Sequence, residues 1–90
     1  MNTTKHATII DVRSPGEFFG KHISGAINIP VEEVARNINE IKKMPKPIVV
    51  YCRSGHRSGM AVAMLKQFGI TEVENGGGMA NMLQAQMPKA

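Results

Sequence analysis

The residues best suited to chemistry in this 90-residue chain gather around its only cysteine, Cys52. Six residues that offer positive charge, hydroxyl groups or a flexible backbone follow it: Arg53, Ser54, Gly55, His56, Arg57 and Ser58. Cysteine attacks as the thiolate, and cationic side chains or the N-terminus of a helix favour that form. Backbone N–H groups at such a place also bind anions. Residues 52–58, which we call the cysteine loop, therefore predict a nucleophile in an anion-binding loop.

A single cysteine is most often a small buried hydrophobic residue without chemistry. Two observations oppose that interpretation for Cys52. It stands at the expected boundary between a strand and a loop rather than inside the strand, and the five residues after it include no large apolar side chain. We therefore interpret Cys52 as a reactive residue rather than a packing residue.

The segments on either side of the cysteine loop predict the elements that position it. Residues 48–51 are apolar and favour β structure, which is typical of a buried strand. After the loop, apolar residues recur at helical spacing, at Met60, Met64, Leu65 and Phe68. The loop is thus expected to join the carboxyl end of a strand to a helix that Gly69 terminates.

Strands and helices alternate along the rest of the chain. Further strands are expected at residues 7–11, 26–29 and 70–74, and further helices at residues 14–20, 30–43 and 79–86. This alternation predicts one α/β domain over residues 1–90, with a mostly parallel sheet of about four strands and helices on both faces. Sites in such sheets form at the carboxyl ends of the strands. Three polar or reactive residues fall at such ends: Asp11, Cys52 and Asn75.

The first expected helix carries a specific start signal. Ser14 and Glu17 have the spacing of a capping box, and Pro15 suits the first turn. At least one of the two phenylalanines that follow, Phe18 and Phe19, is expected to be buried.

Composition narrows the classes of partner. Lysine and arginine number 11 against 7 acidic residues, and the formal charge of +4 suits a small anionic substrate. The charges are scattered, and with one tyrosine and no tryptophan no platform for stacked bases is visible, so no nucleic-acid partner is expected. No apolar run has the length of a membrane span, so no membrane partner is expected. Without a secretory signal we expect a cytoplasmic protein, or a periplasmic one if the chain is a mature form lacking its leader.

Two separated motifs resemble those of the rhodanese family of sulfurtransferases, especially its small single-domain, phage-shock-type members. The first covers residues 10–18 (IDVRSPGEF) and 22–30 (HISGAINIP), and the second is the cysteine loop with the strand before it. A weaker third motif covers residues 73–78 (VENGGG). Together they span most of the chain in the order and spacing of the family.

The resemblance implies a reaction and a set of roles. Cys52 would attack the outer sulfur of thiosulfate, release sulfite and hold a persulfide, whose sulfur then passes to cyanide or a cellular thiol. Backbone N–H groups of the loop would stabilise the transferred group, and Arg53 and Arg57 would bind the sulfonate. No cofactor is implied. Because the chain has no second cysteine, an outside acceptor has to take the sulfur. Three residues would support the loops beside the site: Asp11, Arg13 and His22.

The chain also departs from the family pattern. The family fold implies one more strand and helix before Ala7, for which these 90 residues leave no room. We therefore expect an exposed sheet edge and weak self-association through it. The family often has an aromatic residue after its glycine pair, and the lack of one here predicts a more open pocket wall.

Alternatives remain for the activity and for single residues. A cysteine-dependent phosphatase or arsenate reductase has its arginine six positions after the cysteine, whereas here Arg57 stands five after and Ser58 takes that place. A non-catalytic rhodanese-like module, or a persulfide relay to one protein partner, is the other alternative. His56 either adds positive charge or is an exposed loop residue, and Ser58 either serves the cradle or caps the helix. No metal is expected, because the histidines and Cys52 lack ligand spacing.

Overall fold

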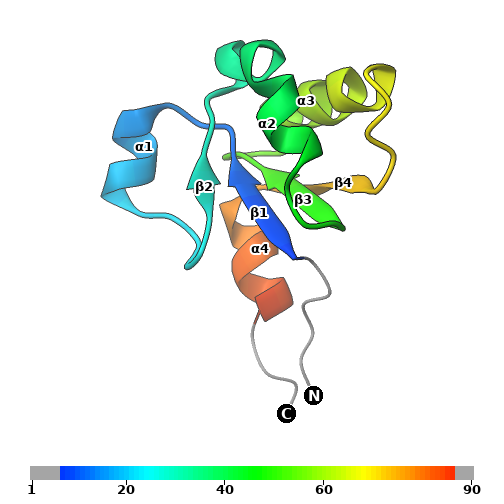
Figure 1. Cartoon of the computed structure of the whole chain (residues 1–90). Helices are drawn as coiled ribbons and strands as arrows, with labels where there is room; N and C mark the ends of the chain where they lie inside the picture. Colours follow the sequence, from blue (N-terminus) through cyan, green and yellow to red (C-terminus); the bar gives the residue numbers. More distant parts are fainter. Residues whose placement is uncertain (1–6, 87–90) are drawn as a thin grey trace.

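The computed structural model describes residues 7–86, which form an α/β structure around a four-stranded parallel sheet, as predicted (Figure 1). The strands are β1 (Thr8–Asp11), β2 (Ile27–Asn28), β3 (Ile48–Tyr51) and β4 (Val73–Gly77), in the spatial order β2-β1-β3-β4. The helices are α1 (Pro15–Gly20), α2 (Ile38–Lys42), α3 (His56–Gln67) and α4 (Met79–Gln86). Two 3₁₀ turns precede α2, namely η1 (Val31–Glu33) and η2 (Ala35–Asn37).

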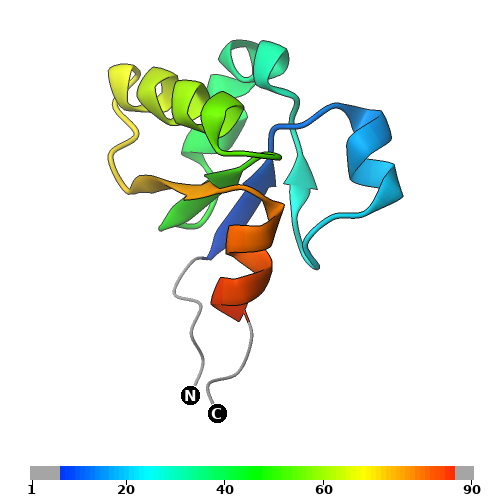
Figure 2. The ribbon, with the colours of Figure 1, turned by 180° about the vertical axis from the view of Figure 1, so that it is seen from behind.

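The central strand β3 divides the core into two clusters because alternate side chains of a strand point to opposite faces. Ile48, Val50 and Cys52 belong to a cluster that α2 and α3 cover. Val49 and Tyr51 belong to a second cluster on the other face, which α4 covers. Figures 1 and 2 show α2 and α3 over one face of the sheet and α4 against the other. The prediction of helices on both faces is confirmed.

The segment before β3 differs from the single helix expected over residues 30–43. It forms η1, η2 and only then α2. The side chain of Asn37 donates a hydrogen bond to the carbonyl of Glu33 (2.8 Å), and its backbone N–H turns instead to the carbonyl of Val34 (3.0 Å). Asparagine thus competes with the helical backbone for an acceptor, which favours the tighter 3₁₀ turn. The apolar side chains of Ile38 and Ile41 in α2 are nevertheless buried.

Helix α1 begins with the predicted capping box. The side chain of Ser14 accepts a hydrogen bond from the N–H of Glu17, and the carboxylate of Glu17 accepts one from the N–H of Ser14 (3.0 Å). The expectation that a phenylalanine is buried here is wrong: Phe19 is 82% exposed, and Phe18 is half-buried and stacks on His22. The reason is the position of α1, which lies beyond β2 at the edge of the molecule rather than over a face of the sheet (Figures 1 and 2).

Strand β4 begins and ends three residues later than predicted, and it includes Gly76 and Gly77. A bulge lets Val50 pair with Asn75 and Tyr51 with Gly77. A β-carbon at Gly76 would lie 2.5 Å from the sulfur of Met82 and 2.8 Å from a methyl group of Val49. Glycine normally weakens a strand, but here its lack of a side chain lets α4 and β3 pack against β4.

Helix α3 begins at His56, so the last three residues of the cysteine loop form its first turn. The helix ends before Gly69, whose positive φ of 92° suits the predicted terminating glycine. Its buried face consists of small and medium residues: Ser58, Ala61, Val62 and Leu65. Met60 and Phe68 from the predicted apolar pattern are about half exposed.

Candidate active site

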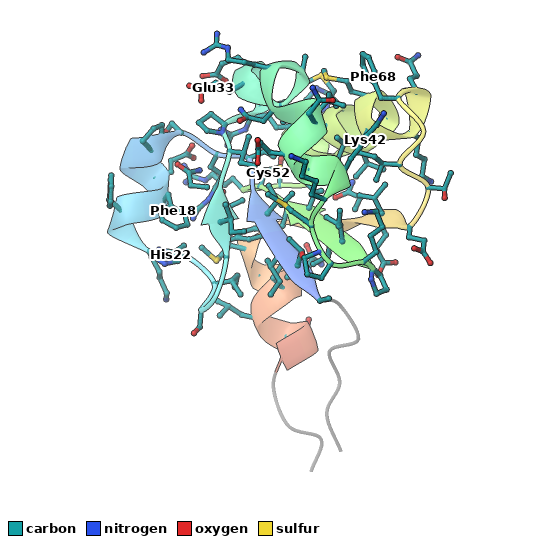
Figure 3. The ribbon with its side chains drawn as sticks, viewed as in Figure 1. Phe18, His22, Glu33, Lys42, Cys52 and Phe68 are labelled. Carbon is teal, nitrogen blue, oxygen red and sulfur yellow. The ribbon has the colours of Figure 1, made fainter. Side chains whose placement is uncertain are left out.

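Cys52 follows directly after β3, and its side chain is buried at the base of the cysteine loop (Figure 3). Its sulfur accepts hydrogen bonds from the N–H groups of Gly55 (3.0 Å) and Ser58 (3.4 Å), and the hydroxyl oxygen of Ser58 lies 3.5 Å away. Gly55 precedes α3 with a φ of 99°, a conformation that glycine adopts without strain. This turn curls the loop around the sulfur so that its donors converge there.

The surroundings of Cys52 act on its thiol in opposite directions. Burial raises the pKa of the thiol, because it disfavours the charged form. Hydrogen bonds from the Ser58 hydroxyl and from the N–H groups of Ser58, Gly55 and Ser54 lower the pKa, and together they outweigh burial. The N-terminus of the twelve-residue helix α3 acts in the same direction. The pKa of Cys52 therefore lies below its ordinary value, as a nucleophile requires.

Asn75 joins the cysteine loop to β4 and was not singled out as a site residue from the sequence. Its Oδ1 accepts hydrogen bonds from the hydroxyl of Ser58 (2.6 Å) and the N–H of Gly77 (2.8 Å). Its Nδ2 donates to the carbonyl of Gly55 (3.1 Å). Ser58 is therefore not the cap of α3, a position that Gly55 occupies. The only signal in the sequence was the place of Asn75 near the carboxyl end of a strand.

Arg57 pairs with Glu17, a second contact that sequence reasoning missed. Its two terminal nitrogens donate to the two carboxylate oxygens of Glu17, at 2.9 and 3.2 Å. Hydrogen bonds from Arg57 and from Ser14 lower the pKa of Glu17 to about 2. The pKa of Arg57 is raised, first by Glu17 and also by the nearby charge of Cys52. Arg57 thus lies within electrostatic reach of the sulfur, but its guanidinium is held by α1.

The other residues of the cysteine loop lie on its outer side. Arg53, Ser54 and His56 are exposed. Ser54 forms an isolated antiparallel bridge with Gly78, where a β-carbon would collide with the carbonyl of Arg53. The glycines after Asn75 therefore serve close packing of strand, loop and helix.

Asp11 and Arg13 form a buried ion pair on the side of Tyr51. The guanidinium and backbone N–H of Arg13 bind the Asp11 carboxylate, the shortest contact being 2.7 Å. The Tyr51 hydroxyl donates to Asp11 (2.8 Å) and accepts from the N–H of Ile23 (3.0 Å). Burial raises the pKa of Tyr51 to about 12; the hydrogen bond from Ile23 opposes this shift and the hydrogen bond to Asp11 adds to it. This network ties β1 and β3 to the segment after α1.

His22 belongs to the same side of the molecule as α1. Its Nδ1 lies 2.8 Å from the carbonyl of Phe18, and its ring stacks on the ring of Phe18 at 3.7 Å. Figure 3 shows both residues at the outer edge, away from Cys52 near the middle. The structure thus places Asp11, Arg13 and His22 among residues that brace loops, not around the sulfur.

Residues 7–86 contain neither a cluster of metal-binding side chains nor a membrane-spanning helix. Within them, no group of three or more histidine, cysteine, aspartate or glutamate side chains is arranged to hold a metal ion. The helices of this part of the chain are all too short or too polar to cross a membrane.

A thiol at the carboxyl end of a parallel strand, surrounded by N–H donors at a helix N-terminus, defines a cysteine-dependent group-transfer site. Comparison with known proteins identifies the family. The family model of the Rhodanese-like domain matches residues 1–84, and the chain belongs to that family.

Individual relatives agree with this family. The chain is 41% identical over 81 residues to the thiosulfate sulfurtransferase PspE of Escherichia coli, covering 89% of this chain and 75% of PspE. It is 45% identical over 71 residues to the uncharacterised protein YqhL of Bacillus subtilis, covering 79% of this chain and 56% of YqhL. Among solved structures, a rhodanese with anions from E. coli superimposes with a TM-score of 0.75 at 40% identity, covering 82% of this chain and 88% of the other.

Proposed function

We propose that this protein is a sulfurtransferase that carries a sulfane sulfur on Cys52, from thiosulfate or a related donor to cyanide or a thiol. The observation that carries the proposal is the convergence of the Gly55 and Ser58 N–H groups on the Cys52 sulfur. The likeness to a thiosulfate sulfurtransferase, PspE, supports thiosulfate as a donor.

The first half-reaction forms the persulfide. The Cys52 thiolate attacks the outer sulfur of thiosulfate, and a new sulfur–sulfur bond forms. The bond between the two sulfur atoms of thiosulfate breaks, and its electron pair leaves with sulfite. Three negative charges enter the reaction and three leave it, one on the persulfide and two on sulfite. The N–H donors of the loop stabilise the negative charge on the transferred sulfur, as an oxyanion hole does for oxygen.

The second half-reaction returns the thiolate. Cyanide or a thiolate attacks the terminal sulfur of the persulfide, and the electron pair of the broken bond returns to Cys52. With cyanide the product is thiocyanate. Since Cys52 is the only cysteine, no second thiol of the chain competes with the outside acceptor.

The residues around Cys52 receive roles in this proposal. Arg57, and more weakly the exposed Arg53, bind the sulfonate oxygens of the donor. Ser54, Gly55, His56 and Ser58 shape the rim and cradle. Asp11, Arg13 and His22 hold the neighbouring loops in place.

Mass spectrometry of the intact protein tests the carrier role. Incubation with thiosulfate should add the mass of one sulfur atom, and cyanide should remove it again with release of thiocyanate. Cys52→Ser should gain no mass. A gain that persists in this variant contradicts the role of Cys52. Hydrolysis of para-nitrophenyl phosphate without any thiocyanate formation would instead favour the phosphatase alternative.

A further inference from the structure

We propose that Glu17 selects the sulfur donor by charge: because its carboxylate already holds Arg57, the site favours donors with one negative charge over the dianion thiosulfate. The inference rests on the proposed function and names the donor class within it. Organic thiosulfonates fit this class, because they offer the same outer sulfur on a sulfonyl group but carry one charge less.

The contact between Glu17 and Arg57 occupies the end of the guanidinium that a sulfonate would use. Both terminal nitrogens of Arg57 donate to it, in the two-point geometry that arginine uses for any planar or tetrahedral oxyanion. A sulfonate that binds Arg57 has to displace Glu17 or lie beside it. In either arrangement the negative charges of donor and carboxylate lie a few ångströms apart.

Glu17 is held in this place independently of Arg57. Its Oε1 accepts hydrogen bonds from the N–H of Ser14 (3.0 Å) and from the Ser14 hydroxyl (3.1 Å), both part of the cap of α1. Displacement of the guanidinium therefore leaves the carboxylate at the rim of the site. The hydrogen bonds from Ser14 lower the pKa of Glu17 independently of Arg57, so the carboxylate stays ionised near neutral pH and protonation does not relieve the repulsion.

The charge balance near the sulfur favours the monoanion. Arg57 lies close enough to Cys52 for their charges to interact, and Glu17 neutralises that arginine. The cation that remains in the cysteine loop, Arg53, is exposed to solvent, which screens it. Repulsion by Glu17 acts about twice as strongly on a dianion as on a monoanion. The N–H cradle, in contrast, serves the transferred sulfur of both donors equally.

Thiosulfonates and thiosulfate react with Cys52 by the same displacement and differ only in the leaving group. The Cys52 thiolate attacks the outer sulfur of a thiosulfonate, and the electron pair of the broken sulfur–sulfur bond leaves with a sulfinate instead of sulfite. Two negative charges enter this step and two leave it. The same Cys52 persulfide results, so the second half-reaction is common to both donors and cancels in a comparison between them.

Glu17→Gln removes the negative charge and preserves the capping box of α1 and a contact with Arg57. Glutamine serves the same position of a capping box, and its amide oxygen still accepts a hydrogen bond from Arg57. The matched control is Glu72→Gln, which changes the net charge equally but lies at the amino end of β4, at the opposite end of the sheet from Cys52. Thermal unfolding of both variants checks that the fold is retained.

The experiment compares kcat/KM for thiosulfate and benzenethiosulfonate, with saturating cyanide, in wild type and both variants. Glu17→Gln should raise the ratio of the thiosulfate value to the thiosulfonate value about five- to tenfold, mainly through KM for thiosulfate. Glu72→Gln should leave the ratio unchanged, and added salt should shrink the effect of Glu17→Gln.

Other outcomes overturn the inference. If Glu17→Gln lowers kcat/KM for both donors alike, Glu17 only braces Arg57. An unchanged ratio, or equal shifts in both variants, excludes local charge selection. If no protein forms a Cys52 persulfide with either donor, the proposed function fails and the inference fails with it, a result that mass spectrometry separates from the others.

Discussion

The sulfur of Cys52 and the side chain of Asn75 compete for the single hydrogen of the Ser58 hydroxyl. The orientation of the Asn75 amide is fixed, because Gly77 offers an N–H to its oxygen and Gly55 a carbonyl to its nitrogen. The hydroxyl therefore donates to Asn75 in the thiol state. A thiolate, as a charged acceptor, draws the same hydrogen more strongly. Asn75 thus limits how far Ser58 stabilises the thiolate.

The pKa of the Cys52 thiol is the first quantity to measure. Because the Ser58 and Gly55 donors favour the thiolate, the rate of alkylation by iodoacetamide should reach half its maximum below the ordinary cysteine value of roughly 8.5. Ser58→Ala removes the hydroxyl and should move this midpoint upward. A wild-type midpoint at or above the ordinary value would contradict the hydrogen-bond account.

Asn75→Asp should raise the same midpoint. The variant keeps an acceptor for Ser58 but adds a negative charge near the sulfur and loses the donor to Gly55. A negative neighbour disfavours the thiolate, so alkylation near neutral pH should slow by roughly tenfold, which corresponds to a rise of about one pH unit. Asn39→Asp on the exposed side of α2 is the matched control. Equal alkylation rates in Asn75→Asp and Asn39→Asp would show that Asn75 does not affect the Cys52 thiolate.

The two arginines of the cysteine loop should differ in their effect on thiosulfate. Arg57→Ala should raise KM well beyond Arg53→Ala, by about tenfold or more, since it removes a two-point donor and leaves Glu17 uncompensated. Arg57→Lys should restore only part of the loss because lysine lacks the fork. Equal losses that vanish together at high salt would mean that both residues act only as diffuse positive charge.

At the scale of elements, Gly76 fixes how closely β4, β3 and α4 pack. Gly76→Ala places a methyl group against Met82 and Val49 and should destabilise the protein by about 1–3 kcal/mol, the usual range for overpacking. Gly20→Ala is the control, since open space surrounds that position. Urea unfolding measures both. A loss in Gly76→Ala no larger than in Gly20→Ala would show that α4 yields to the methyl group.

Local patterns in the sequence predicted those features that neighbouring residues determine. The capping box of Ser14 and Glu17 involves residues three positions apart, and the buried strand β3 is a continuous run of four apolar residues. The contacts that complete the site are long-range. Glu17 and Arg57 are 40 positions apart, and Ser58 and Asn75 are 17 apart. The sequence around each of these residues does not indicate which distant residue becomes its partner in the folded chain.

Two local effects accompany the differences from the elements predicted at residues 30–43 and 70–74. Asn37 takes the carbonyl that a regular helix would use, and the bulge between β3 and β4 shifts the strand by one residue. Both effects are small in energy and depend on the tertiary fold, so propensity alone does not reveal them. The resemblance to the rhodanese family, which the comparison confirms, carried no information on Glu17 as a partner of Arg57.

At the scale of the whole molecule, the sheet formed by residues 7–86 has two edge strands, which differ in length and in charge. Edge strand β2 has two residues, too few to pair well with another chain. Edge strand β4 has five and carries Glu74, with Glu72 just before it, and charged side chains on an edge oppose pairing. Weak self-association is therefore expected through β4, and its strength should depend on these two carboxylates.

Sedimentation velocity over a concentration series tests this expectation. The wild type should sediment as a monomer that associates only at high concentration. Replacing Glu72 and Glu74 by threonine removes two like charges that two copies would bring together and introduces residues that favour strands, so association should begin at a lower concentration. Glu40→Thr on the exposed side of α2 should behave like the wild type. If the double variant remains a monomer at every concentration, the β4 edge is not a surface for self-association, because removing the charges that oppose pairing does not cause pairing.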